Sequence, residues 1–376
     1  MTAPMSMEKG HRQPQRQERQ QQQRRQPLII SASRRTDIPA FFSPWFMRRL
    51  TAGFAVSVNP FNPRQARQVS LSPRDVEAIV FWSKNPRPLL RHLGELDDRG
   101  FRYYFQFTLN AYDKALEPFL PPVAERVGTF LELAARLGRE RVLWRYDPII
   151  LSSETPPAWH LDRLGAIGEE LRGAAGRLTI SFMDFYPKVQ KRLSKVEEST
   201  GQRFYDAAEG ERKDEVGELC RGIATLGRAW DLPVVSCGEP LDLAPYGIRA
   251  GACIDAELIR WMREGSGLFD SADVGGAGAG HGPSVERVAG PSGGTSAGRA
   301  AVGTARRDPN QRPECLCTSS VDLGAYNTCS HGCVYCYANF SPASIRANLC
   351  RHSPNTPSLL GEVAETSPHE TAPPEE

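Results

Sequence analysis

Short apolar runs alternate with segments of helical periodicity along most of this 376-residue chain. Strands buried in a parallel sheet read as continuous apolar runs, whereas amphipathic helices repeat apolar residues every 3.6 positions. About seven such units over about 230 residues predict an α/β fold, a complete or partial (β/α) TIM-like barrel, in preference to an open doubly wound sheet. The runs that fit the strand pattern are Leu28 to Ser33, Phe54 to Asn59, Ala78 to Ser83, Tyr103 to Leu109, Arg141 to Tyr146, Leu178 to Phe185 and Pro233 to Cys237.

Three segments of biased composition divide the rest of the chain. Residues 1–27 are rich in Gln and Arg and bury too little apolar surface to fold, so they predict a disordered tail. Residues 265–308 are rich in Gly, Ala and Ser and predict a flexible insertion. Residues 28–264 form the expected barrel, residues 309–352 a cysteine-rich segment that completes it, and residues 353–376 a loose tail.

Composition and charge describe a soluble protein, with 40% hydrophobic and 24% charged residues. No run approaches the roughly 18 apolar residues of a membrane span, and no apolar signal stretch is present. We therefore expect a cytoplasmic protein with no membrane partner. The net charge is +2, of which residues 1–27 carry +4, so the remainder sums to −2. Only the tail supports a nucleic-acid partner, and the support is weak because charged tails are usually just solvated.

The cysteines are the strongest sign of chemistry. Five of the nine lie between Cys315 and Cys336, and clustered thiols in a reducing compartment indicate metal ligands. The C-x3-C-x2-C spacing of Cys329, Cys333 and Cys336 suits three irons of one [4Fe–4S] cluster and leaves the fourth iron open. The alternative is a zinc or structural metal site that uses Cys315 and Cys317 with two or more of the later thiols.

The roles of the neighbouring residues stay open at this point. Cys315 and Cys317 fit a second metal site, a fourth ligand for the same cluster or a redox pair, and Cys350 fits any of these roles. Gly332 allows the loop to wrap tightly around a bulky cofactor. His331 is expected to face solvent rather than to bind metal.

The cysteine loop, with the aromatic Tyr335 before its last thiol, resembles that of the radical S-adenosylmethionine superfamily. The resemblance implies that the open iron chelates S-adenosylmethionine and that Tyr335 lies against its adenine. Further segments are similar to the uncharacterised domain of unknown function 1848 family, from about residue 28 to about residue 361. That family implies an iron–sulfur protein of unknown substrate. The segments are Ile30 to Pro39, Asn59 to Pro63, Val80 to Pro86, Tyr104 to Thr108, Trp144 to Pro148 and Tyr326 to Ala338.

Two features depart from the superfamily pattern. Its cysteine loop normally follows the first barrel strand, whereas here the loop follows the last unit, as after a circular permutation. Its Gly-Gly-Glu segment, which holds the amino group of S-adenosylmethionine, is not evident here. The enzyme hypothesis therefore requires that the fold bring the loop over the barrel mouth, close to Lys84, Arg145 and Asp147.

Polar residues gather at the ends of the predicted strands, where (β/α) barrels carry their chemistry. Lys84, Arg145, Asp147 and Glu239 are the candidate catalytic residues among them. The alternative for each is a buried ion pair or a strand-end cap, for example Arg145 with Asp147. The full ring comprises Arg34, Arg35, Asp37, Asn59, Lys84, Asn85, Gln106, Thr108, Arg145, Asp147, Asp184 and Glu239.

These observations favour an enzyme similar to the radical S-adenosylmethionine enzymes. The resemblance implies one-electron cleavage of S-adenosylmethionine, a radical that abstracts hydrogen from an unknown small-molecule or macromolecular substrate, and an external electron donor. The alternative is a non-catalytic iron–sulfur or zinc protein for redox sensing or binding. A lyase for DNA lesions, similar to the photoproduct-repair members, is a lesser alternative that only the basic tail favours.

Overall fold

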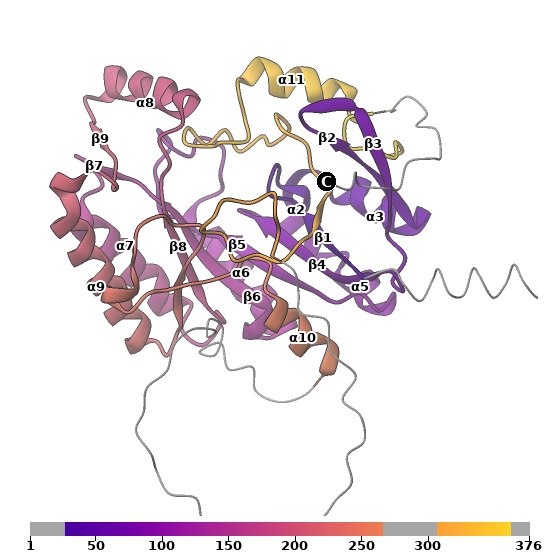
Figure 1. The fold of residues 1–376 in the computed structure, drawn as a ribbon, viewed down its shortest axis with the longest axis horizontal. Coiled ribbons are helices and arrows are strands. Elements are labelled where there is room, and N and C mark those ends of the chain that lie inside the picture. The colour runs from indigo at the N-terminus through magenta and orange to yellow at the C-terminus, as the bar shows by residue number, and fades with distance from the viewer. Residues whose placement is uncertain (1–26, 266–306, 362–376) are drawn as a thin grey trace, which may run out of the picture.

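The computed structural model describes residues 27–265 and 307–361. Eight parallel strands form one sheet in the order β11-β10-β8-β6-β5-β4-β1-β12, and helices pack around it (Figure 1). The strands are β1 (Leu28–Ala32), β4 (Val76–Ser83), β5 (Tyr103–Thr108), β6 (Val142–Ile149), β8 (Leu178–Phe182), β10 (Val234–Ser236), β11 (Arg249–Ala250) and β12 (Val321–Asp322). The predicted α/β architecture with a parallel sheet is confirmed.

The strand order is that of a partial (β/α) barrel. From β1 to β11 the strands follow one another in space as they do in sequence, without the reversal of order that marks a doubly wound sheet. β12, the last strand, lies on the free side of β1. β11 and β12 do not pair with each other, so the barrel stays open between them. We call this gap the seam.

The remaining elements connect the strands. The α-helices are α2 (Ile38–Phe41), α3 (Ser43–Ala52), α4 (Arg87–Leu90), α5 (Leu93–Asp98), α6 (Val123–Leu137), α7 (Pro157–Glu170), α8 (Pro187–Thr200), α9 (Lys213–Ala229), α10 (Ala256–Glu264) and α11 (Pro342–Arg351). Three turns of 3-10 helix are η1 (Arg139–Arg141), η2 (Gly210–Arg212) and η3 (Ala244–Tyr246). Outside the main sheet lie β2 (Phe54–Asn59), β3 (Asn62–Ser70), β7 (Leu151–Ser152) and β9 (Phe204–Tyr205).

One expected barrel strand lies elsewhere. The run Phe54 to Asn59 is a strand, but it pairs antiparallel with β3 in a separate two-stranded sheet. The reason is the tight turn that follows Asn59, because a parallel partner requires a crossover of a dozen residues or more. The other six runs belong to the parallel sheet.

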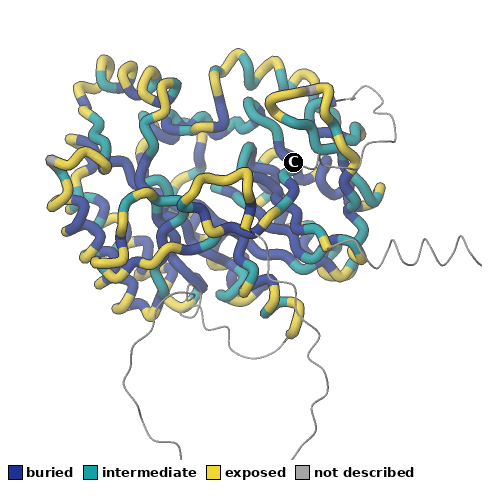
Figure 2. The backbone as a smooth tube through the Cα atoms, viewed as in Figure 1, coloured by how far each residue is buried: buried dark blue, intermediate teal, exposed yellow. Residues whose placement is uncertain are grey.

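Side chains alternate between the two faces of the sheet. The central strands are buried along most of their length, whereas the edge strand β11 is exposed (Figure 2). Outward residues such as Phe81 and Trp144 join the core under the helices. Inward residues such as Val80 and Tyr104 form a second cluster. The barrel interior is therefore a packed core. That second cluster also holds Cys253, Ile254, Leu258, Ile259, Cys315 and Cys317.

No helix in the described ranges is long and apolar enough to cross a membrane. The expected tail and insertion lie almost entirely outside those ranges, and residues 353–361 are the part of the expected C-terminal tail that falls within them.

Candidate metal centre and active site

The cysteine loop, residues 329–336, lies over the carboxyl ends of the central strands. It follows β12, which pairs with β1. The Val334 amide donates to the Leu116 carbonyl in the connection after β5, at 3.0 Å. His331 Nε2 lies 2.7 Å from an oxygen of Asp37, the residue that caps α2. The fold thus brings a loop that comes late in the sequence to the mouth of the barrel, as the enzyme hypothesis requires.

The Asp37 carboxylate joins three parts of this mouth. It accepts hydrogen bonds from the Ala40 amide at 2.9 Å and, at the end of β4, from the Ser83 hydroxyl and the Lys84 amide, each at 2.8 Å. His331 is its fourth partner and is only 3% exposed. The prediction that His331 faces solvent is therefore wrong, because its ring turns inward to the carboxylate that follows β1.

Lys84 belongs to a buried polar network beside the loop. Its Nζ lies 2.8 Å from Glu117 Oε1 and 2.9 Å from the Tyr335 hydroxyl, which also donates to Glu117. Arg126 Nη2 lies 3.7 Å from the other Glu117 oxygen. Burial opposes the charge on Lys84, but the Glu117 carboxylate outweighs it and raises the pKa of Lys84. Burial likewise opposes the charge on Glu117, and the two cations outweigh it and lower the pKa of Glu117.

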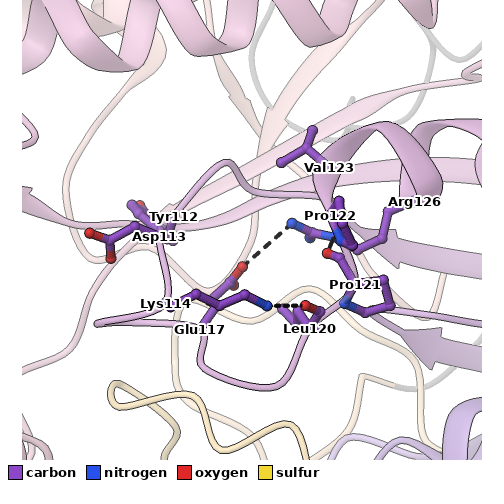
Figure 3. Close-up of a pocket in the computed structure, with 9 residues that line it drawn as sticks. All are labelled: Tyr112, Asp113, Lys114, Glu117, Leu120, Pro121, Pro122, Val123 and Arg126. Atoms are coloured by element: carbon purple, nitrogen blue, oxygen red, sulfur yellow. Dashed lines mark hydrogen bonds and ion pairs between the residues drawn. The ribbon is translucent and has the colours of Figure 1, made fainter.

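A cavity of about 210 Å³ opens beside this network, between the connection after β5 and the start of α6 (Figure 3). Its wall includes Tyr112, Glu117, Leu120, Pro122 and Arg126. Glu117 Oε2 and Arg126 Nη1 make no hydrogen bond. Both atoms are buried, and their residues belong to the ion pair that lines the cavity.

The three thiols of the loop lie near one another without converging on a point. Cys329 interacts electrostatically with Cys333 and Cys336. Within residues 27–265 and 307–361, however, no group of three or more His, Cys, Asp or Glu side chains is arranged to hold a metal ion. Burial raises the pKa of Cys333 to about 12 although Lys84 acts against that rise. A metal would have to displace the thiol proton.

Two further features suit this loop to a thiolate-bound group. Gly332 adopts a φ of +72°, where a Cβ would lie 2.7 Å from the Phe119 ring, so the backbone approaches its neighbours closely. The Ala338 amide donates to Cys336 Sγ at 3.3 Å, and the Arg192 guanidinium of α8 donates to the Cys336 carbonyl. These contacts place an amide donor at Cys336 Sγ and a guanidinium group beside the loop.

Arg145 and Asp147 pair with each other at the end of β6, as the structural alternative predicts. Arg145 Nε lies 3.0 Å from Asp147 Oδ2, and the Ser181 hydroxyl donates to Oδ1. Burial opposes both charges, but each partner outweighs it, so the pKa of Arg145 is raised and that of Asp147 is lowered. Arg145 Nη1 also lies 2.6 Å from Cys253 Sγ.

The remaining candidates of the ring have other partners. Glu239 accepts the amides of Phe182 at 2.9 Å and Leu241 at 3.2 Å, so it caps the strand end, and burial raises its pKa. Asn59 bonds to Gln65 within the β2–β3 hairpin. The prediction that places Asn59 in the ring is therefore wrong, because its strand lies outside the barrel. Asp184 forms an ion pair with Arg312 at 2.7 Å.

Four other cysteines meet inside the barrel, and only two of them were expected to matter. Cys315 and Cys317 share this place with Cys237 and Cys253. The Sγ atoms of Cys237 and Cys253 lie 2.6 Å apart, and Cys317 Sγ accepts the backbone amides of Cys253 and Ile254. No local spacing marks Cys237 or Cys253, since each stands alone in sequence. Cys350 is exposed on α11.

Sequence reasoning also missed Asp322, which fixes β12 against β1. Its carboxylate accepts the hydroxyls of Ser31 at 2.7 Å and Ser33 at 2.6 Å and the amide of Arg34 at 2.8 Å. The local signal is only an acidic residue between Val321 and Leu323, shortly before Gly324. That signal is too common to single out a residue.

The family comparison covers the sheet, the mouth and the cysteine loop together. The domain of unknown function DUF1848 matches residues 29–338, which is more than half of the chain. No curated protein and no solved structure matches the chain. On the strength of that match, the chain belongs to the DUF1848 family.

Proposed function

We propose that this protein is an iron–sulfur enzyme in which Cys329, Cys333 and Cys336 hold a [4Fe–4S] cluster at the barrel mouth, with S-adenosylmethionine as the second cofactor. The observation that carries the proposal is the place of the loop. It lies at the carboxyl edge of a parallel sheet, in contact with Asp37 through His331 and with Lys84 through Tyr335. That edge is where (β/α) barrels carry out chemistry.

The donor set fits the cluster, since three thiols at this spacing leave one iron free of protein ligands. Such a cluster supplies an electron for the reductive cleavage of S-adenosylmethionine. Binding would draw the three sulfurs of the loop together. Lys84 and Arg192 bring positive charge close to Cys333 and Cys336, which offsets the negative charge of thiolates.

Other residues of the mouth suit a polar ligand. Glu117 and Arg126 bring one negative and one positive charge to the wall of the cavity, which suits a polar ligand. The Arg145–Asp147 pair keeps both charges within the barrel. We therefore propose a polar substrate. The reductive cleavage of S-adenosylmethionine also requires an external electron donor.

A non-catalytic metal-binding protein for redox sensing or binding is the second candidate. The observation that favours it is that Lys84, Arg145 and Asp147 already have partners inside the protein. Fully paired charges suit a structural role as well as a catalytic one. The DNA-lesion hypothesis rests on the basic tail, which lies outside the described residues.

Anaerobic reconstitution of the full chain with iron and sulfide tests the proposal. After reduction, the wild type should give an electron paramagnetic resonance signal of a [4Fe–4S] cluster that changes when S-adenosylmethionine is added, and it should form 5'-deoxyadenosine. Cys333→Ser should lose the signal. Cys220→Ser is the matched control, because Cys220 is a fully buried cysteine of α9.

The two candidates give different results. A cluster signal that S-adenosylmethionine leaves unchanged, with no 5'-deoxyadenosine formed, would favour the non-catalytic protein. A Cys333→Ser variant with the wild-type signal would show that the loop does not hold the cluster.

A further inference from the structure

We propose that Cys237, Cys253, Cys315 and Cys317 bind a single metal ion through four thiolates, at a site inside the barrel that closes its open seam. This site is separate from the loop of Cys329 and does not depend on the function proposed above.

The four cysteines come from the two sides of the seam. Cys237 follows β10 and Cys253 follows β11, which is one edge of the sheet. Cys315 and Cys317 precede β12, which is the other edge. The Thr318 amide donates to the Ile254 carbonyl at 3.1 Å, so the two chain segments run side by side across the gap. A metal ion at these thiols would connect strands that make no ladder with each other.

The thiols lie close to one another. Cys237 Sγ lies 2.6 Å from Cys253 Sγ, and both Cys315 and Cys317 interact electrostatically with Cys237. The amides of Cys253 and Ile254 both donate to Cys317 Sγ, at 3.2 and 3.3 Å. Amide donors of this kind stabilise metal-bound thiolates.

The charges around the thiols are complementary to such a site. Arg145 Nη1 lies 2.6 Å from Cys253 Sγ. Arg34 interacts electrostatically with Cys317 and Cys253, and its buried Nη2 has no hydrogen-bond partner. Four thiolates and a divalent ion together carry two negative charges. Two guanidinium groups therefore lie close to the negative charge that the loaded site would have.

The spacing of the sulfurs favours one ion over a cluster. With bonds of about 2.3 Å, two thiolates on a tetrahedral zinc ion lie about 3.8 Å apart, and a cubane cluster separates its ligands further. The 2.6 Å between Cys237 and Cys253 is shorter than either and longer than the roughly 2.05 Å of a disulfide. These two thiols are thus too close together to share an ion as they stand, and a parting of about 1 Å brings them to the spacing of two ligands on zinc. Four thiolates make the closed coordination of a structural site.

Metal analysis of the full chain tests this inference in a background that lacks the cysteine loop thiols. The Cys329→Ser/Cys333→Ser/Cys336→Ser variant, purified anaerobically, should retain about one zinc per chain. Adding Cys253→Ser and Cys317→Ser to that background should lower the zinc content per chain at least tenfold. Adding Cys220→Ser instead should leave it unchanged, because Cys220 is equally buried but lies in α9.

A second measurement guards against misfolding of the Cys253→Ser/Cys317→Ser variant. Cobalt exchanged into the variant that lacks the three loop thiols should give the absorption spectrum of a tetrahedral four-thiolate site. The four cysteines of the site should resist alkylation until a chelator is added. The inference is overturned if the Cys329→Ser/Cys333→Ser/Cys336→Ser variant contains no metal. It is also overturned if that variant contains iron and sulfide, or a disulfide between Cys237 and Cys253.

Discussion

His331 Nε2 lies 2.7 Å from Asp37 Oδ2, and this contact ties the cysteine loop to the first turn after β1 across 294 positions of the sequence. Asp37 also caps α2 and holds the residues that follow β4. One buried carboxylate therefore sets the relative position of the loop and of Lys84. Both belong to the proposed site.

Asp37→Ala should destabilise the protein by about 3 kcal/mol, because it removes a helix cap and leaves further buried donors without an acceptor. Urea unfolding followed by circular dichroism gives this free energy. Asp162→Ala is the control, since the Asp162 side chain is 72% exposed and pairs only at 3.7 Å. It should cost less than about 0.5 kcal/mol. Equal losses in the two variants would show that Asp37 does not organise the mouth.

Glu117→Gln should lower the free energy of unfolding by about 3 to 5 kcal/mol, because Lys84 and Arg126 would then share no buried carboxylate. In the Glu117→Gln/Lys84→Met double variant, the loss of unfolding free energy should be smaller than the sum of the losses in the two single variants, by about 1 to 3 kcal/mol. The exposed pair of Arg172 and Glu169 is the control cycle and should show much weaker coupling, because solvent screens its charges. Additive losses for Lys84 and Glu117 would mean that their contact contributes nothing.

The sequence predicted the strands that are buried on both faces and missed those that are short. β4, β5 and β6 read as apolar runs because helices cover one side of them and the interior cluster fills the other. β11 and β12 have two residues each, too few for a recognisable pattern. The strand Phe54–Asn59 has the right composition, and only its pairing with β3 reveals that it leaves the barrel.

The contacts of the site also fall into those that the sequence could indicate and those that it could not. Arg145 and Asp147 are two positions apart, so their pairing was foreseeable as an alternative. The contact of Tyr335 with Lys84 spans 251 positions, and that of Cys317 with Cys253 spans 64. Such contacts follow from topology, above all from the placement of β12 beside β1, which no local pattern of residues encodes.

Gly332→Ala should lower the free energy of unfolding by about 1 to 2 kcal/mol, because a φ of +72° is unfavourable for an alanine and its Cβ would approach Phe119. Gly332→Ala with Phe119→Ala removes the contact but keeps the backbone strain, so most of the loss should remain. Gly128→Ala is the control, as it lies in α6 with open space around it and should be neutral or stabilising. Urea unfolding measures all three, and a neutral Gly332→Ala would show that the loop does not hold this backbone conformation.

His160 should make the protein less stable in mild acid. Its ring is buried, donates from Nε2 to the Ile150 carbonyl at 3.0 Å and accepts at Nδ1 from the Tyr146 hydroxyl, so the neutral form is satisfied. Burial lowers the pKa of His160 from 6.5 to about 4. Between these two pKa values the unfolded chain binds the proton more readily than the folded chain does. The stability that neutral His160 contributes is therefore complete above pH 6.5 and declines as the pH falls toward 4.

From pH 7 to pH 5 the loss through His160 should be about 2 kcal/mol. His160→Gln should be less stable at pH 7, but its free energy of unfolding should fall less between the two pH values than that of the wild type. Urea unfolding at both pH values gives the comparison, and the ring titration followed by nuclear magnetic resonance gives the pKa directly. Equal pH dependence in the two proteins would mean that His160 takes up its proton as readily in the folded chain as in the unfolded one.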